Sequence, residues 1–422
     1  MIRADLVIYG ARQLVTLADV TVPPGPRRGH DLAELSVIEQ GALAARDGKI
    51  VWIGPADALP RQVSQLSGCG VFDATGHVVT PGLVDPHTHL VFARGRAVEF
   101  SQRAAGKSYS EIAQAGGGIA RSVADLRAGA FDELCRNAGK IASRMLTYGT
   151  TTAEAKSGYG LDLEHELKML RAIRTVDSSH AIDLVPTALP AHTIPVEYRS
   201  RPSDYVDLVC HEILPAVARE KLAVFNDIFV ESGAFSIAWA ERIQSAAASL
   251  GFGLRFHVDQ LSPMKGTELA VRLGAISADH LDFISDDGIR CLADSTTIGV
   301  LIPGVSYFLD CTQRPPARRM IEAGVAVALA TDCNPGSNMC ESMTQTMNQA
   351  CVLYRMSPEE ALTAATVNAA WSLQRADRIG SLSVGKQCDC VIWDTDDYRD
   401  LSYHYGVNLA VHVIKNGMRA AP

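Results

Sequence analysis

The pattern of apolar and polar positions divides the chain into a centre and two ends. In the centre, eight apolar runs have the length of buried strands: residues 78–90, 151–156, 182–192, 228–231, 254–260, 275–281, 299–303 and 325–331. Helical spacing lies between them, at residues 130–146, 163–176, 239–250, 263–273 and 317–323. Strands that alternate with helices indicate parallel pairing, and eight such units predict an α/β fold with a closed (β/α)₈ barrel of the TIM type.

An open, doubly wound sheet is the competing arrangement. That fold carries a Gly-x-Gly-x-x-Gly sequence directly after its first strand. Here the triplet Gly116-Gly117-Gly118 lies well downstream of the first apolar run, and its spacing does not match. The pattern therefore favours the closed barrel.

The two ends read as short strands and turns. Residues 42–53 have the pattern of a hairpin around Arg46-Asp47-Gly48-Lys49. Residues 389–393 and 411–417 repeat this style near the other end. We expect the ends to complete one small β domain, with residues 1–77 plus 371–422 in that domain and residues 78–370 in the barrel.

Composition narrows the class of protein. The chain has 422 residues, of which 47% are hydrophobic and 20% charged, as in globular proteins with a large core. The net charge of -8 argues against nucleic acid as a partner. No apolar run is long enough to cross a membrane, and the N-terminus has no signal-peptide core. Ten cysteines without a Cys-x-x-Cys pair predict a reduced, cytoplasmic location.

Polar side chains end several of the apolar runs. Active sites of such barrels lie at the carboxyl ends of the strands, so these residues are expected to meet. They are His87 and His89 on the first run, His192 on the third, His257 on the fifth, His280 on the sixth and Asp332 on the eighth.

Four of these residues form a plausible metal shell. His87 and His89 share one side of an extended strand because side chains alternate with a period of two. Together with His257 and Asp332 they offer a His₃Asp set that suits Zn²⁺ or Fe²⁺ with a position left for water. Such an ion makes hydroxide available near neutral pH.

Two candidates remain for proton transfer. Asp332 can bind the metal and also take a proton from the attacking water. His280 can hydrogen-bond that water or the developing oxyanion, or it is a core histidine bonded to a backbone carbonyl. The division of the proton transfer between them stays open.

The run Pro81-Gly82-Leu83-Val84-Asp85-Pro86-His87-Thr88-His89, followed by His257, His280 and Asp332, resembles the amidohydrolase superfamily, whose split ends form a β sandwich. Narrower motifs resemble one branch of it: His89-Leu90-Val91-Phe92-Ala93-Arg94-Gly95-Arg96, Ala115-Gly116-Gly117-Gly118-Ile119, Lys156-Ser157-Gly158-Tyr159-Gly160-Leu161 and Thr331-Asp332-Cys333-Asn334-Pro335-Gly336-Ser337. The likeness covers nearly the whole chain.

The resemblance implies hydrolysis of the cyclic amide 4-imidazolone-5-propanoate to N-formimidoyl-L-glutamate in histidine degradation. It implies one Zn or Fe ion on His87, His89, His257 and Asp332, and a homodimer. It also implies that the substrate is contacted by Arg96, Tyr159, His192, Gln260, Asn334, Gly336 and Ser337.

The residue chemistry is compatible with these roles but does not require them. Arg96 can bind the substrate carboxylate in two places, although a solvated loop charge is the simpler account from the sequence alone. Tyr159 is equally well explained as a packed tyrosine. A turn explains Pro335 and Gly336, although not their place directly after a candidate ligand.

Two alternatives to this function are deamination of a heterocyclic base and a catalytically silent barrel. Gln260 speaks against the deaminase, since an amide cannot shuttle protons where such an enzyme needs a carboxylic acid. The complete ligand set speaks against the silent barrel. Glu231, at the end of the fourth run, stands where two-metal relatives carry a lysine, so a single metal is expected. Residues 97–123 are a candidate lid.

Overall fold

The computed structural model describes residues 1–18, 24–107, 111–112 and 116–421. Eight parallel strands form the barrel: β6 (Leu83–Asp85), β7 (Thr150–Lys156), β8 (Asp183–Ala191), β9 (Phe225–Val230), β10 (Gly253–Val258), β11 (Ser277–His280), β12 (Ile298–Leu301) and β13 (Val327–Leu329). They follow one another in chain order around the sheet. Every predicted strand region is present, and the predicted fold class is confirmed.

The barrel closes just beyond its first and last strands. The amide of Asp332 donates to the carbonyl oxygen of His87 at 2.9 Å, and the amide of His89 donates to that of Cys333 at 2.9 Å. These bonds join the segment after β6 to the segment after β13. Closure therefore takes place at the carboxyl ends of the strands, where the candidate ligands lie.

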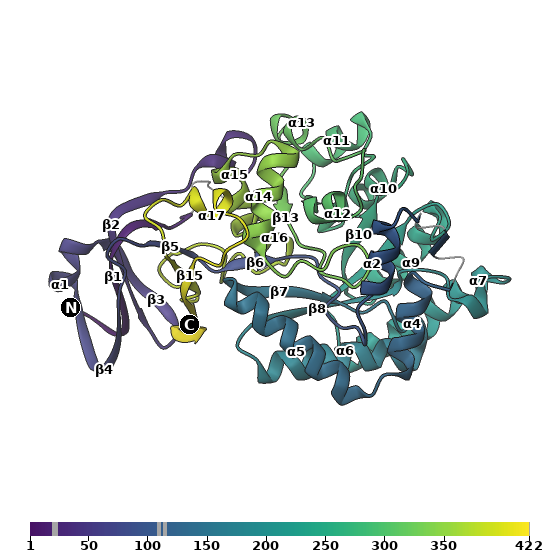
Figure 1. Cartoon of the computed structure of the whole chain (residues 1–422), viewed down its shortest axis with the longest axis horizontal. Helices are drawn as coiled ribbons and strands as arrows, with labels where there is room; N and C mark the ends of the chain where they lie inside the picture. Colours follow the sequence, from purple (N-terminus) through teal and green to yellow (C-terminus); the bar gives the residue numbers. More distant parts are fainter. Residues whose placement is uncertain (19–23, 108–110, 113–115, 422) are drawn as a thin grey trace.

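Helices cover the outside of the barrel (Figure 1). In chain order they are α2 (Ala97–Ala104), α4 (Ile119–Ala128), α5 (Phe131–Thr147), α6 (Leu163–Ser179), η3 (Val196–Tyr198), α7 (Pro202–Leu208), the π-helix η4 (Val209–Ile213), α8 (Leu214–Glu220), α9 (Ile237–Ser249), α10 (Gly266–Arg272), α11 (Asp286–Ala293), α12 (Pro303–Phe308), α13 (Ala317–Glu322), α14 (Met343–Tyr354), α15 (Pro358–Ala364) and α16 (Val367–Ser372). All five predicted helical regions are helices. No helix among the described residues has the length and hydropathy needed to cross a membrane.

Segments from both ends of the chain form a second sheet. Its strands are β1 (Ile2–Val15), β2 (Val37–Arg46), β3 (Lys49–Pro55), β4 (Val63–Asp73), β5 (Val78–Pro81), β14 (Cys390–Trp393), β15 (Ala410–Lys415) and β16 (Met418–Ala421), with the short helices η1 (Gly29–Ala33), η2 (Ala56–Ala58), α1 (Leu59–Gln62) and α17 (Asp400–Tyr403). Figure 1 shows the purple and yellow ends of the chain together beside the barrel. The expected β domain made from both ends is confirmed.

The hairpin between β2 and β3 has the predicted turn. Arg46 pairs with Lys49, and the two residues between them have positive φ, 50° at Asp47 and 76° at Gly48. Two consecutive left-handed residues match a type I′ turn, whose twist suits a hairpin.

One predicted run was wrong in its extent. Residues 78–90 are not a single strand, because β5 pairs with β1 and β14 in the terminal sheet while β6 pairs with β7 in the barrel. Gly82 separates the two strands, and a Cβ there would collide with the side chain of Thr151. His87 and His89 therefore follow a strand that ends at Asp85, rather than lying within it.

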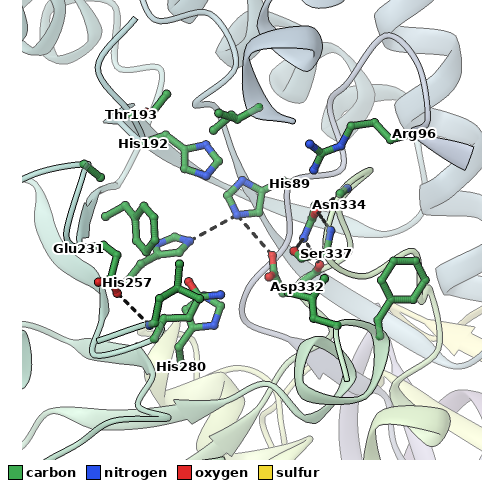
Figure 2. Close-up of a pocket in the computed structure, with 18 of the residues that line it drawn as sticks. His89, Arg96, His192, Thr193, Glu231, His257, His280, Asp332, Asn334 and Ser337 are labelled. Carbon is green, nitrogen blue, oxygen red and sulfur yellow. Dashed lines mark hydrogen bonds and ion pairs between the residues drawn. The ribbon is translucent and has the colours of Figure 1, made fainter. Parts of the chain in front are cut away.

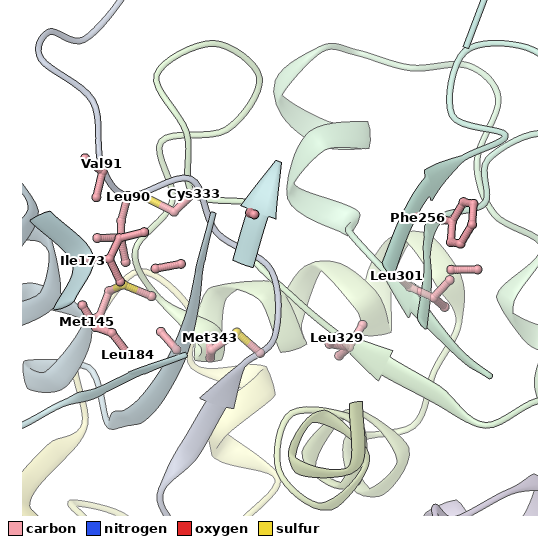
Figure 3. Packing of buried hydrophobic residues seen from close by; sticks show 14 of the residues in the cluster. Leu90, Val91, Met145, Ile173, Leu184, Phe256, Leu301, Leu329, Cys333 and Met343 are labelled. Carbon is pink, nitrogen blue, oxygen red and sulfur yellow. The ribbon is translucent and has the colours of Figure 1, made fainter. Parts of the chain in front are cut away.

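A large apolar cluster fills the space between the strands and the helices (Figure 3). It contains Leu184 of β8, Phe256 of β10 and Leu329 of β13 from the barrel, all nearly or completely buried. Trp393 of β14 belongs to the same cluster. Part of the terminal sheet thus packs into the barrel core, while the sheet also has a cluster of its own around Leu14, Leu43 and Ile414.

Candidate active site

The carboxyl ends of the barrel strands surround a cavity of about 750 Å³. All predicted site residues except His87 line it: His89, Arg96, Tyr159, His192, His257, Gln260, His280, Asp332, Asn334, Gly336 and Ser337. His87 is completely buried behind the cavity wall. A cavity of this size matches a small-molecule site.

Backbone contacts hold the His87-Thr88-His89 segment beyond the end of β6. Thr88 Oγ1 donates to the carbonyl oxygen of Glu154 at 2.6 Å, and its amide donates to Glu154 Oε2 at 3.1 Å. The closure bonds to Asp332 and Cys333 hold the other side. Because the backbone is fixed on both sides, the two imidazoles keep the common direction that a strand would have given them.

Ligand atoms of four residues lie close together beside the cavity, and Figure 2 shows three of these residues, His89, His257 and Asp332. Asp332 Oδ1 lies 3.4 Å from His89 Nε2 and 3.6 Å from His87 Nε2, and His257 Nε2 lies 3.4 Å from His89 Nε2. Ligand nitrogens about 2.1 Å from a tetrahedrally bound ion are about 3.4 Å from one another. The spacing of the atoms of His87, His89 and Asp332 therefore fits one metal ion, and His257 Nε2 adjoins this group through His89.

The hydrogen bonding of these atoms also fits a metal. Within the described part of the chain, His87 Nε2 and Asp332 Oδ1 are buried and have no hydrogen-bond partner. Buried polar atoms in native proteins are almost always paired, so an unpaired acceptor pair at one point indicates a missing cation. His280 joins His87 and His257 in a second group of converging donors.

Burial keeps the imidazoles of His87, His89, His192 and His280 neutral. It lowers the pKa of His87, His89 and His280 well below the usual value, and it lowers the pKa of His192 to about 3. Neutral imidazole is the form that binds a metal. Burial also raises the pKa of Asp332 to about 7 in the absence of a cation.

Two of the site residues have a left-handed backbone. The φ angle is 81° at His280 and 49° at Asp332. This conformation is disfavoured for residues with a side chain, and it persists where the surroundings enforce it. Asp332 is held by the closure bond from its amide to His87.

Arg96 and the turn after Asp332 pack against each other. A Cβ at Gly336 would collide with Arg96 Nη2, so only glycine leaves room for this guanidinium. The Arg96 side chain is 10% exposed, and its nearest charged neighbour is Glu99, at 3.6 Å. Among the described residues, Nε and Nη1 of Arg96 have no hydrogen-bond partner. The cavity thus contains a largely buried cation whose Nη1 forms a long ion pair with Glu99 and whose Nε has no hydrogen-bond partner in the described structure.

Within the described residues, the side-chain amide of Asn334 makes all its hydrogen bonds to residues of its own turn. Its Oδ1 accepts from the amides of Gly336 at 2.7 Å and Ser337 at 2.8 Å. Its Nδ2 donates to the carbonyl oxygen of Asp332 at 2.8 Å and to Ser337 Oγ at 2.7 Å. Asn334 therefore shapes the wall that holds Gly336 against Arg96.

Tyr159 and His192 form the opposite wall. Glu166 of α6 is completely buried, and its Oε1 accepts from the amides of Gly158, Gly160 and Leu161 at 3.2, 2.9 and 2.9 Å. His192 stacks on His89 with 5.0 Å between the ring centroids. Its Nδ1 is 3.0 Å from the carbonyl oxygen of Gly158, which ties His192 to the loop that carries Tyr159.

Gln260 is presented by a loop that buried carboxylates hold. Glu231 accepts from the amide of Leu261 at 2.8 Å and from the hydroxyl of Ser262. Asp259 accepts from Thr267 Oγ1 at 2.6 Å. Glu231 is therefore a loop anchor at the end of β9.

The sequence reading missed a layer of charged residues beneath the histidines. Asp279 Oδ2 lies 2.6 Å from His87 Nδ1, and Asp227 Oδ2 lies 3.1 Å from His257 Nδ1. Both carboxylates are completely buried. The available signal was a polar residue inside an apolar run, at an even spacing from a candidate ligand, as with Arg255 and His257.

The candidate lid lies partly outside the described residues, which leave out 108–110 and 113–115. The helices α2 and α4 flank that gap, and Phe100 and Arg103 of α2 line the cavity. Whether this segment moves stays a prediction.

Comparisons with known proteins agree on a family. Residues 78–419 match the amidohydrolase family. A relative from Geobacillus kaustophilus named imidazolonepropionase is 45% identical, and the alignment covers 98% of this chain and 97% of that protein. One of the same name from Symbiobacterium thermophilum is 47% identical, with 98% and 96% covered.

Solved structures show the same fold at low sequence identity. The chain is similar to an adenosine deaminase from Xanthomonas campestris with bound zinc, with a TM-score of 0.71, 19% identity, and 99% and 93% of the two chains covered. It is also similar to an atrazine chlorohydrolase from Arthrobacter aurescens in complex with zinc, with a TM-score of 0.69, 17% identity, and 98% and 94% covered. At such identities the likeness concerns the fold alone.

Proposed function

The chain belongs to the amidohydrolase family, among its imidazolonepropionases, and on that premise we propose how its residues act. It is a hydrolase of a carbon–nitrogen bond, and its reaction opens 4-imidazolone-5-propanoate to N-formimidoyl-L-glutamate in histidine degradation. The family and the reaction predicted from the sequence motifs are confirmed. The alternatives, a heterocycle deaminase and a silent barrel, are thereby set aside.

The proposed metal centre consists of His87, His89, His257 and Asp332 and holds one Zn²⁺ or Fe ion per subunit. The observation that supports it is that His87 Nε2 and His89 Nε2 both lie beside the unpaired Asp332 Oδ1, with His257 Nε2 next to His89 Nε2. An ion bound there supplies a Lewis acid and lowers the pKa of a water molecule towards neutrality. His₃Asp ligand sets serve both metals.

Asp332 and His280 are proposed to move the protons. A water adds to the ring carbonyl carbon, and Asp332 accepts its proton because the carboxylate lies at the metal centre. His280, which is neutral and lines the same cavity, hydrogen-bonds the oxyanion that develops. The proton held by Asp332 then goes to the ring nitrogen as the carbon–nitrogen bond breaks.

The remaining cavity residues are proposed to hold the substrate. Arg96 binds the propionate, since its Nε has no hydrogen-bond partner in the described part of the chain and the side chain is largely shielded from solvent. Tyr159, His192 and Gln260 contact the ring, and Gln260 only binds or orients because its amide does not transfer protons. The turn at Asn334, Gly336 and Ser337 completes the wall beside Arg96.

The proposal also includes a cytoplasmic homodimer. The ten cysteines are free, which suits a reducing compartment. Only the family resemblance supports the dimer.

Asp332→Asn tests the proposed roles. The amide cannot accept the proton of water, so we expect turnover of imidazolonepropionate to fall by about 10²- to 10⁴-fold. Metal content and hydrolysis are measured on the same purified samples of wild type and variant, with a hydantoin and guanine as control substrates. Full turnover in a variant that still binds metal contradicts the assignment of Asp332 as the base.

A further inference from the structure

A closed ionic network lies in the barrel beneath the candidate metal ligands. Its five members are completely buried and come from β7, β9, β10 and β11: Glu154, Lys156, Asp227, Arg255 and Asp279. Replacing buried ion pairs by apolar side chains is often neutral or stabilising, so fold stability alone does not explain such a network. Its contacts with the histidines suggest another role.

One branch of the network runs from Lys156 to His257. Lys156 Nζ donates to Glu154 Oε1 at 2.6 Å and to Asp227 Oδ2 at 2.7 Å. The same Asp227 oxygen lies 3.1 Å from His257 Nδ1, and Asp227 Oδ1 accepts from the amide of Ile228 at 2.7 Å. Lys156 and the backbone thus fix the carboxylate that faces the back of the imidazole.

The other branch runs from Arg255 to His87. Arg255 Nη2 donates to the carbonyl oxygen of Pro86 at 2.8 Å and lies 3.3 Å from Asp279 Oδ2. That oxygen lies 2.6 Å from His87 Nδ1. Arg255 therefore contacts both the carboxylate behind His87 and the residue before it in the chain.

A carboxylate lies beside Nδ1 of each histidine: Asp279 forms a hydrogen bond with His87 Nδ1, whereas Asp227 lies at ion-pair distance from His257 Nδ1. A carboxylate beside Nδ1 keeps the proton on that nitrogen and leaves the lone pair of Nε2 for a metal. His87 Nε2 and His257 Nε2 are the nitrogens that face the ligand cluster. His89 differs within the described structure, because its one ion pair, with Asp332, is made through Nε2, and its ring stacks on His192.

We propose that Lys156 and Arg255 are positioning residues of the metal centre: each clamps a buried carboxylate, Asp227 or Asp279, that orients a metal-binding histidine, His257 or His87. The proposal rests on the metal centre proposed above. The charges agree with it, since three carboxylates and two cations leave one negative charge. The carboxylate of Asp332 brings the total to two, which matches a divalent cation.

The test removes the clamp without changing the charge of the network. Lys156→Met with Glu154→Gln deletes one positive and one negative charge and leaves Asp227 without its lysine. The matched control is Lys415→Met with Asp389→Asn in the terminal sheet. There a lysine with a 3% exposed side chain also binds two carboxylates, Asp389 at 2.6 Å and Asp183 at 2.7 Å.

Metal-free full-length proteins are titrated with Co²⁺ in competition with a chelator, and the visible absorption of bound Co²⁺ is recorded. We expect the Lys156/Glu154 pair to lose about 10- to 100-fold in Co²⁺ affinity and to shift the absorption bands. We expect the Lys415/Asp389 pair to keep both at the wild-type values. Glu154→Gln alone keeps Lys156 on Asp227 but changes the acceptor of the Thr88 amide, so it measures that contact separately, and the double variant should lose more Co²⁺ affinity than it does.

If the Lys156/Glu154 double variant has the Co²⁺ affinity and absorption of the wild type, the positioning role is wrong. The proposed function is tested separately, by hydrolysis of the substrate by the wild-type protein. Failure of the wild type to bind Co²⁺ overturns the metal centre itself. If the Lys156/Glu154 double variant does not fold, the Co²⁺ affinity of Asp227→Asn, whose side chain is equal in size, tests the same contact with His257. Unchanged Co²⁺ affinity in that variant overturns the proposal.

Discussion

At the scale of single residues, Arg96 and Gly336 decide how the cavity meets the substrate. The guanidinium occupies the space where any other residue at position 336 would place its Cβ. Its Nε has no hydrogen-bond partner among the described residues, and it has little solvent around it. A hydrogen bond to a charged group contributes about 1.5–3 kcal/mol, so this contact is large enough to control KM.

Arg96→Ala is expected to raise the KM for imidazolonepropionate by about 10- to 100-fold and to change kcat less. Gly336→Ala pushes the guanidinium away, so it should raise KM in the same direction. Because both substitutions act on one contact, their effects in the double variant should be less than additive. Steady-state kinetics of the four proteins measure this coupling.

Gly139→Ala is the control for the glycine substitution. Gly139 lies within α5, and a Cβ there has open space around it. The KM of Gly139→Ala should equal that of the wild type. An unchanged KM in Arg96→Ala would remove the carboxylate-binding role, and full additivity would mean that Gly336 acts independently of Arg96.

At the scale of elements, helix α6 holds the loop that follows β7. Glu166→Ala removes the acceptor of three loop amides, so Tyr159 should lose its fixed place. We expect a higher KM and a loss of about 1–3 kcal/mol in the free energy of unfolding, since buried amides lose their partner. Glu166→Gln retains an acceptor oxygen, so its KM and its free energy of unfolding should lie between those of Glu166→Ala and the wild type.

Co²⁺ affinity separates this loop from the metal centre. Glu166 contacts none of the four proposed ligands, so the affinity should be unchanged in Glu166→Ala. A loss of metal comparable to that expected for the Lys156/Glu154 pair would argue against a local effect on the loop.

The elements also show what a sequence can predict. The strand regions and their polar ends were recognisable because burial leaves apolar runs, and His257 and Asp332 stand at such ends. The split at Gly82 was not recognisable, since it depends on contact with Thr151 in another strand. Asp227, just before an apolar run, and Asp279, inside one, were missed because a charge at such a position acquires its meaning only from the strand beside it.

At the scale of the whole molecule, the terminal sheet is joined to the barrel by its core. Trp393 of β14 is 1% exposed, and its Nε1 donates to Thr80 Oγ1 at 2.9 Å. A Cβ at Gly149, just before β7, would lie 2.7 Å from Trp393 Cη2. Lys415 of β15 also binds Asp183 of β8. The division into residues 1–77 plus 371–422 and 78–370 stays a prediction, and β5 (Val78–Pro81) lies in the terminal sheet; the packing between the two parts predicts that they unfold together.

Trp393→Ala tests whether the two parts unfold together. Removing this side chain leaves a cavity between the sheet and the barrel, and we expect a loss of about 3–5 kcal/mol in the free energy of unfolding. Hydrogen exchange at increasing denaturant, read by peptide mass spectrometry, should show sheet and barrel peptides losing the same amount, because both depend on the shared core. Trp239→Ala, on the outer helix α9 where the ring is only half-buried, should cost less. If peptides of the terminal sheet exchange at lower denaturant than barrel peptides in the wild type, the sheet unfolds independently of the barrel. That result would contradict a single folding unit.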